Sequence, residues 1–258
     1  MAYRMIDLSV PLENDVPSDP PGYEYRIEYL NHRDTFPIWE RRYKGLKIED
    51  LPNQEAFALE KVQLSTHNGT HVDAPWHYAS TSEDGKPMPT IDEMPLEWFF
   101  GPGVKLDFRH FADGHVVTAA EVEQELARIG HQLQPGDIVL VNTSAGARYG
   151  QPDYTSRGCG MGREATLYLT ERGVRVAGID AWGWDVPVQY MAQEYERTGS
   201  ASHIWQGHKA GRVTHYCHIE KLHNLEMLPA TGFKVACFPV KIRGASGGWT
   251  RAVAIFDA

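Results

Sequence analysis

Hydrophobic and polar positions along the chain predict strands at both ends and alternating strands and helices in the middle. Runs rich in β-branched and apolar residues, as in strands, cover residues 4–10, 57–66, 103–108, 137–142, 174–179, 233–242 and 250–256. Helical periodicity covers residues 118–130, 163–173 and 188–199, and each of these stretches ends at a glycine, as many helices do. This order predicts a mixed α+β or α/β domain rather than a β-sandwich.

The sequence indicates one domain with one unusual segment. We find no internal repeat, low-complexity tract or glycine/serine linker in it, so we expect a single domain over residues 1–258. Residues 20–56 are rich in aromatic residues but have weak periodicity. We expect this segment to form a lid over a site or an arm in an oligomer.

The composition favours a small-molecule partner. The net charge is −9 and the basic residues are dispersed apart from residues 40–44, so we expect no nucleic-acid or membrane partner. Asp7 interrupts the N-terminus before an apolar run, and no stretch approaches the roughly 18 apolar residues of a membrane span, so we expect a cytoplasmic protein. The three cysteines are far apart, which favours buried thiols over a disulfide framework or a thiolate zinc site.

The stretch "STHNGTHVDAPWHY", residues 65–78, carries the clearest candidate chemistry. It contains His67, His71, Asp73 and His77, separated by residues that include asparagine, glycine and proline. These intervening residues disfavour a helix, so we expect an extended chain. In a strand, alternate side chains share a face, so His71 and Asp73 would point the same way.

A divalent metal explains this cluster better than packing does. An isolated histidine is more often a surface residue or a hydrogen-bonded core residue, but three imidazoles and a carboxylate together would crowd charge unless a cation compensated. Imidazole and carboxylate suit zinc or manganese. Further ligands are expected from a second histidine-rich stretch, and composition does not choose among its candidates: His203, His208, His215, His218, Glu220 and His223.

The first histidine-rich stretch also carries a family resemblance. Its residues match the H-x-G-T-H-x-D-x-P-x-H signature of the metal-dependent cyclase family, which includes bacterial kynurenine formamidases and isatin hydrolases. The resemblance extends to "IDLSVPL", "LTERGVRVAGIDAWGWD", "HIEKLHNLEMLP" and "GASGGWTRAVAI". It implies a mixed β/β/α "swivelling" domain and a homodimer or homotetramer.

The resemblance assigns a role to each residue of the motif. His67, His71 and Asp73 would be metal ligands, with Asp73 able to bridge two ions, and His77 would be the catalytic acid/base. One or two divalent ions, Zn²⁺ or Mn²⁺, would be bound per chain.

The remaining ligands follow from a spacing in the formamidases, where a histidine lies twelve residues before a late glutamate. His208 precedes Glu220 by that interval, so these two residues would complete the ligand set. His215 and His218 would then be surface residues or lie behind the ligands.

The function implied is hydrolysis of an amide, a lactam or a related C–N bond by a metal-activated water. A bound metal lowers the pKa of water from about 15.7 towards 7. A lactone or ester hydrolase, or a cyclase of the same family, is the alternative.

The substrate is expected to be aromatic. The formamidases carry a tryptophan shortly after the first strand, whereas this chain reads "ENDVPSDP" there, which argues against formylkynurenine. Trp76, Trp182 and Trp184 are the expected substrate-binding residues, with Trp205 in a neighbouring segment.

Three other functions are weaker. A 2-His-1-carboxylate iron oxygenase would use His71 and Asp73 but leave His67, His77 and Glu220 without a role. A serine hydrolase is suggested by "GASGG" at residues 244–248, but a nucleophile elbow needs a helix after the turn, and we expect a hairpin loop between strands there. A non-catalytic metal-binding protein would have little use for His77.

Overall fold

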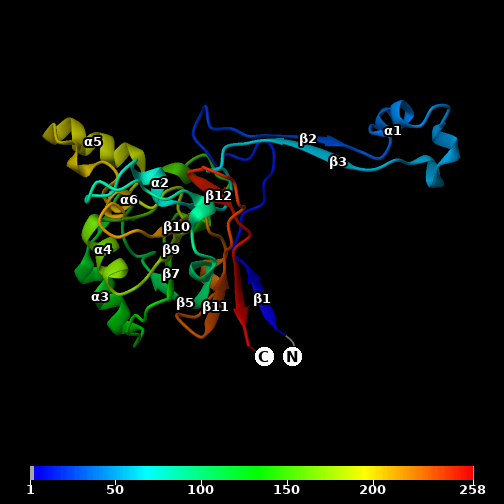
Figure 1. The fold of residues 1–258 in the computed structure, drawn as a ribbon. Coiled ribbons are helices and arrows are strands. Elements are labelled where there is room, and N and C mark those ends of the chain that lie inside the picture. Colours follow the sequence, from blue (N-terminus) through cyan, green and yellow to red (C-terminus); the bar gives the residue numbers. More distant parts are fainter. Residues whose placement is uncertain (1–2, 258) are drawn as a thin grey trace.

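A nine-stranded mixed sheet forms the body of the protein in the computed structural model, which describes residues 3–257 (Figure 1). Its strand order is β1-β13-β11-β5-β7-β9-β10-β4-β12. The strands of this sheet are β1 (Arg4–Asp7), β4 (His71–Asp73), β5 (Phe100–Asp107), β7 (Ile138–Asn142), β9 (Val176–Ile179), β10 (Cys217–Glu220), β11 (Phe233–Ala236), β12 (Gly247–Trp249) and β13 (Val253–Phe256). The predicted mixed α+β class is confirmed.

The middle of the sheet is parallel and its edges are antiparallel. β5, β7, β9 and β10 run parallel to one another, and all five residues of β7 are buried, as in sheets covered on both faces. Alternate residues of β7 pack into two cores, Val139 and Val141 on one face and Ile138 and Leu140 on the other.

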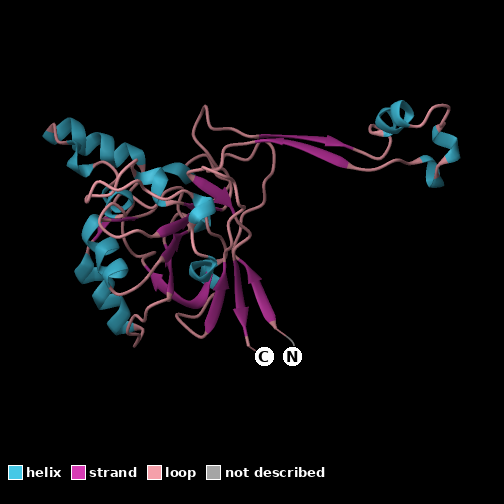
Figure 2. Ribbon diagram, viewed as in Figure 1, coloured by secondary structure: helices cyan, strands magenta, loops and turns pink. Residues whose placement is uncertain are grey.

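Helices cover one of these faces and one end of the sheet. The helices are α1 (Phe36–Arg42), α2 (Pro75–Tyr78), α3 (Ala119–Arg128), α4 (Arg163–Glu171), α5 (Val188–Thr198) and α6 (Gln206–Ala210). α3 and α4 lie side by side against the sheet (Figure 2). The predicted cap of α3 is present, because the Thr118 side chain accepts a hydrogen bond from the Glu121 amide. Short strands β6 (Val116–Val117) and β8 (Gly160–Met161) pair beside them.

The three predicted helices and seven predicted strands are present, but most of the strands are shorter than predicted, β11 most of all. β11 ends at Ala236, whereas the apolar run continues to 242. Pro239 has no N–H for a sheet ladder, and the flanking Phe238 and Val240 are exposed. All three cysteines are buried and free, as predicted.

An arm projects from the body. β2 (Arg26–Leu30) and β3 (Leu59–Gln63) form an antiparallel ribbon, and α1 lies with two short 3₁₀ turns at its far end (Figure 1). This arm contains most of the segment predicted to be a lid or an oligomer arm. Among residues 3–257, no helix is long and apolar enough to cross a membrane.

Candidate metal centre

The first histidine-rich stretch folds into a buried strand and a single helical turn. β4 carries His71 and Asp73 between β10 and β12, so the predicted extended conformation is confirmed for residues 71–73. The expectation that the whole stretch avoids helix is wrong for α2, which begins at Pro75 and carries His77. Proline is favoured in the first helical turn because its missing N–H is not needed there.

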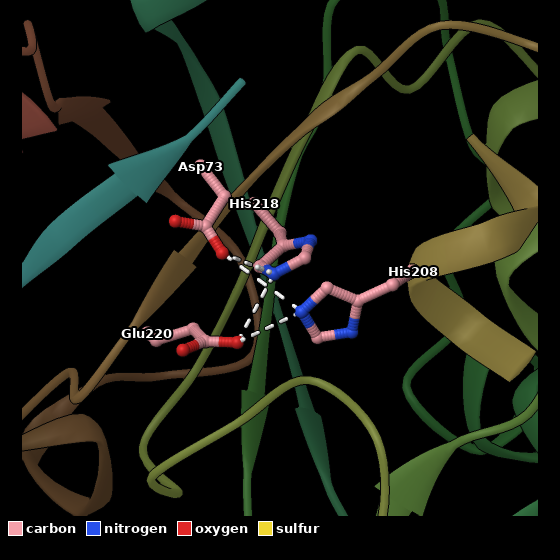
Figure 3. Close-up of side chains that lie close together, drawn as sticks. All are labelled: Asp73, His208, His218 and Glu220. Carbon is pink, nitrogen blue, oxygen red and sulfur yellow. Dashed lines mark hydrogen bonds and ion pairs between the residues drawn. The ribbon is translucent and has the colours of Figure 1, made fainter. Parts of the chain in front are cut away.

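Strand pairing brings the second histidine-rich stretch to Asp73. In the β4–β10 register, Asp73 lies opposite His218 and His71 opposite Glu220. The Nε2 atom of His218 lies 3.2 Å from Asp73 Oδ2 and 3.1 Å from Glu220 Oε1. His208, from α6, places Nε2 3.5 Å from Glu220 Oε1 and 3.9 Å from Asp73 Oδ2 (Figure 3). The four residues form a group of the size that can hold a metal ion.

A second group shares Asp73 with the first. His67 Nδ1 lies 2.7 Å from Asp73 Oδ1, and His77 Nε2 lies 3.7 Å from Asp73 Oδ2. His71 Nε2 lies 3.2 Å from Asp73 Oδ1 and 3.6 Å from Glu220 Oε2, between the two groups. Four of the predicted residues therefore lie within 4 Å of the Asp73 carboxylate, and Glu220 is joined to them through His71 and His208.

Buried polar atoms without partners indicate that a cation fits this site. His71 Nε2 and both carboxylate oxygens of Asp73 are buried and lack a hydrogen-bond partner among the described residues. Buried polar atoms are almost always satisfied, so such a group calls for an ion or water. Imidazole nitrogens and carboxylate oxygens are the donors that zinc and manganese accept.

The two carboxylates are in the charge state that metal binding needs. Burial raises the pKa of Glu220, but neighbouring imidazoles, His218 first, lower it to about 2. Burial also raises the pKa of Asp73, but the surrounding histidines hold it well below its usual value. Burial lowers the pKa of His218, yet the neighbouring carboxylates of Asp73 and Glu220 raise it to about 9. The carboxylates are thus ionised, as metal ligands must be.

Hydrogen bonds fix the rings of two candidate ligands. His208 Nδ1 lies 2.6 Å from Asp185 Oδ2, which leaves its Nε2 facing the cluster. The Asp185 carboxylate also accepts hydrogen bonds from the backbone N–H groups of Gly207 and His208 at the start of α6. His71 Nδ1 lies 2.9 Å from the Gly69 carbonyl oxygen. Such contacts orient metal-binding histidines and select the tautomer.

His218 is nearer the centre than the sequence analysis placed it. Its side chain is fully buried, stacked between Tyr78 and Trp184, so the surface interpretation is wrong for this residue. His218 and Glu220 are two residues apart on β10 and face the same way, which strand alternation could have indicated. His215 is half-buried at a groove away from the cluster.

Ser246 is a site residue that the sequence analysis missed. Its Oγ lies 2.9 Å from His67 Nε2, and His67 Nδ1 faces Asp73, the order of contacts found in a serine triad. β12 follows directly at Gly247, so the context is a turn into an edge strand and a nucleophile elbow is excluded. The predicted hairpin loop over 244–248 is therefore corrected to a turn plus the start of β12.

A cavity of about 180 Å³ opens beside the cluster. Its lining includes His67, His77, His208 and Glu220 together with apolar side chains, among them Trp182, Val186, Met191 and Trp205. The Trp205 ring stacks on His208 with centroids 4.5 Å apart and planes 14° apart.

The predicted substrate-binding tryptophans occupy three different environments. Trp182 lines the cavity and donates from Nε1 to Asp19 Oδ1 at 3.1 Å. Trp184 is fully buried, and its backbone N–H donates to Glu220 Oε1 at 2.9 Å, so it supports a candidate ligand from the core. Trp76 is 41% exposed on the short helix α2.

Kynurenine formamidases are among the relatives of this chain. Kynurenine formamidase of Bacillus anthracis is 24% identical over 178 residues, 69% of this chain and 68% of that one. Kynurenine formamidase of Maricaulis maris is 26% identical over 233 residues, 86% and 92% of the two chains.

Solved structures share the fold over almost the whole chain. An isatin hydrolase bound to the product analogue thioisatinate has a TM-score of 0.75 at 20% identity, covering 99% of this chain and 93% of that one. Isatin hydrolase A of Labrenzia aggregata, bound to benzyl benzoate, has a TM-score of 0.72 at 25% identity, covering 99% and 94%. The family model described as "Putative cyclase" matches residues 6–186, so the chain belongs to the cyclase family.

Proposed function

We propose that this protein is a metal-dependent hydrolase that cleaves an amide, lactam or related C–N bond of a small molecule. Its relatives are kynurenine formamidases, and isatin hydrolases share its fold. The predicted class, a hydrolase of non-peptide C–N bonds, is confirmed at this level. A lactone or ester hydrolase, or a cyclase, remains the alternative for the same site.

The environment of the Asp73 carboxylate is the observation that carries the proposal. It is fully buried, and its two oxygens face imidazoles from both histidine-rich stretches without satisfying hydrogen bonds among the described residues. One or two divalent ions, with zinc or manganese as the expected metal, would be held by His67, His71, Asp73, His208 and Glu220. A bound ion of this kind would supply a water of lowered pKa and polarise the scissile carbonyl.

His77 would move the proton. Burial lowers its pKa to about 4 despite the nearby charge of Asp73, so the imidazole is neutral at pH 7 and can accept a proton. It also lines the cavity, where it could pass this proton to the leaving nitrogen. Its ring lies over that of His67 with centroids 4.1 Å apart, which holds it beside the ligands.

The walls of the cavity suit a flat aromatic substrate. Trp182 and Trp205 both line the cavity, beside aliphatic side chains such as Val186 and Met191 and the polar side chains of the cluster. We propose these two tryptophans, rather than Trp76 or Trp184, as the substrate-contacting pair. The volume of about 180 Å³ favours a group of one or two rings.

The experiment is a hydrolysis panel of aromatic formamides, lactams and esters with the purified protein before and after chelation. We expect turnover of at least one amide or lactam, its loss on chelation and its recovery with Zn²⁺ or Mn²⁺. Activity that survives chelation would contradict the proposal. Oxygen-dependent turnover with ferrous iron would favour an oxygenase, and a metal-loaded protein inert towards the panel would favour a binding protein.

The expected homodimer or homotetramer and the cytoplasmic location stay predictions. Neither bears on the chemistry proposed for the cavity.

A further inference from the structure

A buried ion pair lies beside the cavity and outside the candidate ligand set. Lys221 Nζ is paired with Asp19 Oδ1, and their side chains are only 1% and 5% exposed. The two residues are 202 positions apart in the chain. Taking two charges out of water costs free energy that their attraction often fails to recover, so a buried pair is weak evidence of a stabilising role. The groups that this pair holds in place give a better explanation of it.

Lys221 has a backbone conformation that lysine disfavours. β10 ends at Glu220, and the next residue, Lys221, has a φ of 58°, in the left-handed region where a Cβ is crowded. Its N–H donates to the Ala181 carbonyl oxygen, and its carbonyl oxygen accepts from Thr70 Oγ1 at 2.7 Å. Strained residues of this kind concentrate at functional sites. The backbone of Lys221 is thus fixed beside the residue that precedes Trp182.

The side chains of the pair reach two parts of the site. Lys221 Nζ also donates to the carbonyl oxygen of His67, a candidate ligand, at 3.1 Å. Asp19 Oδ1 accepts the indole N–H of Trp182 at 3.1 Å, and both residues line the cavity. The Lys221 ammonium lies 6.0 Å from the centroid of the Trp182 ring. The indole is therefore oriented by a carboxylate that Lys221 holds in turn.

Asp19 lies in a stretch of restricted backbone, residues 17–23, which we call the proline segment. Three of its seven residues are prolines, and proline fixes φ. Asp19 Oδ2 accepts a hydrogen bond from Ser18 Oγ at 3.0 Å, so both of its oxygens are engaged. At the far end of the segment, buried Asn68 donates from Nδ2 to the Tyr23 carbonyl oxygen at 2.8 Å. The segment therefore holds the Asp19 carboxylate in one place.

We propose that Asp19 and Lys221 are positioning residues, whose ion pair fixes the Trp182 indole so that a flat substrate meets a preorganised wall of the cavity. A side chain that is already ordered loses less conformational entropy when a ligand packs on it. The pair acts through Trp182, so it controls how tightly substrate is bound and leaves the chemical step unchanged. The statement about substrate rests on the proposed hydrolase function, whereas the orientation of the indole does not.

Hydrogen exchange of the Trp182 indole tests the positioning without any turnover. In the full chain carrying isotope-labelled tryptophan, each of the seven tryptophans gives one indole N–H signal, and Trp182→Phe identifies the signal of Trp182. We expect Asp19→Ala and Lys221→Met each to shift this signal and to speed its exchange by at least about 10-fold. Lys221 makes no hydrogen bond to the indole, so its effect would pass through Asp19.

Glu125→Ala is the matched control. Glu125 is also a buried carboxylate paired with a cation, Arg128, but it lies on α3, away from the cavity. This variant should leave the Trp182 signal and its exchange unchanged. A change as large as that in Asp19→Ala would mean that the indole responds to any lost ion pair, and would overturn the inference.

A neutral double variant keeps the test valid if the single variants fail to fold. Each single variant leaves a buried charge without its partner, whereas Asp19→Asn combined with Lys221→Met leaves none. Circular dichroism should show this double variant folded. Its Trp182 indole should still exchange faster, because an amide is a weaker acceptor than a carboxylate. Exchange as slow as in the natural chain, in Asp19→Ala or in the double variant, would overturn the inference.

KM and kcat test the effect on substrate. With metal-loaded protein and the aromatic formamide or lactam that it hydrolyses fastest, Asp19→Ala should raise KM about 10-fold while kcat stays within about twofold. Trp182→Phe keeps a ring but lacks the N–H, so it should raise KM by a similar factor. Combining the two should add little, because both remove the same contact. An unchanged KM, or effects that multiply, would overturn the inference.

The two measurements separate this inference from the proposed function. A panel without any hydrolysed compound would count against the hydrolase, and the exchange rates would still decide whether the ion pair orients Trp182. Hydrolysis with normal exchange in Asp19→Ala would count against the ion pair alone.

Discussion

Asp73 joins two groups of side chains that come from distant parts of the sequence. Its carboxylate faces His67 from the same histidine-rich stretch and His218 from β10. Because its oxygens are buried and unsatisfied among residues 3–257, the residue would carry an energetic cost unless it served a bound cation. This energetic cost is the reason to expect the metal and the reaction at Asp73.

His77→Ala separates proton transfer from metal binding. Because His77 would move the proton without being a ligand, we expect turnover to fall by about 10²- to 10⁴-fold. Bound metal, measured by elemental analysis, should stay nearly unchanged. Loss of metal in this variant would contradict the assigned role and make His77 a ligand.

Asp180 gives a pH prediction away from the metal ligands. Burial raises the pKa of its carboxyl to about 7, although Asn142 and Thr143 donate hydrogen bonds that oppose the shift. Between about pH 4 and 7 the folded chain keeps a proton that the unfolded chain has lost. This residue's contribution to the free energy of unfolding therefore decreases as pH rises through that window.

Asp180→Asn removes this titration. The variant should gain stability relative to the natural chain by a few kcal/mol between pH 4 and pH 8, measured by denaturant unfolding at each pH. Any constant cost of the substitution cancels in that comparison. Parallel pH profiles for the two proteins would refute the prediction.

The sequence predicts the local motif, and the resemblance adds His208 and Glu220, but two residues that strand pairing brings to the site are missed. One motif contains His67, His71, Asp73 and His77, so their spacing in the sequence is enough to identify them as site candidates. Ser246 reaches His67 only because β12 pairs with β4, and His218 reaches Asp73 only through the β4–β10 register. Single-sequence patterns contain no signal for that register.

At the scale of elements, the edge strand β12 packs against the candidate ligands through its pairing with β4. Gly247 lies opposite Asp73, and a Cβ there would come within 2.9 Å of the Val72 carbonyl oxygen and 3.0 Å of the His67 ring. Only glycine leaves room for both. The strand therefore positions two candidate ligands without contributing one.

Gly247→Ala should displace these groups. We expect a loss of about 1–3 kcal/mol of stability together with weaker metal binding, measured by unfolding and by metal titration. Gly248→Ala is the matched control, because its Cβ would meet the Val240 carbonyl oxygen on the opposite face. It should lose stability while its metal affinity stays normal; equal affinities in the two variants would contradict the account.

The strength of the local pattern decides which elements the sequence predicts. α3, with its Thr118 capping box, and the all-buried β7 have strong local patterns. β4 and β12 are only three residues long and contain glycine or histidine, so their pairing outweighs any intrinsic propensity. The ribbon of the arm was expected only as an irregular segment, apart from the strand that contains β3.

For the whole molecule, the central claim is that metal held around Asp73 supports hydrolysis. The candidate ligands come from the first histidine-rich stretch, α6 and β10, which meet only in the folded chain. Metal should therefore bind the native state and stabilise it. Asp73→Asn keeps the shape of the side chain while removing the charge shared by both groups.

The most direct measurement is turnover as a function of metal bound per chain, in protein stripped of metal and reconstituted stepwise with Zn²⁺ or Mn²⁺. We predict that activity rises with bound metal and saturates at one or two ions per chain. Asp73→Asn should bind at least about 10²-fold more weakly and show no such rise. Full activity in metal-free protein, or normal metal-dependent activity in Asp73→Asn, would contradict the claim.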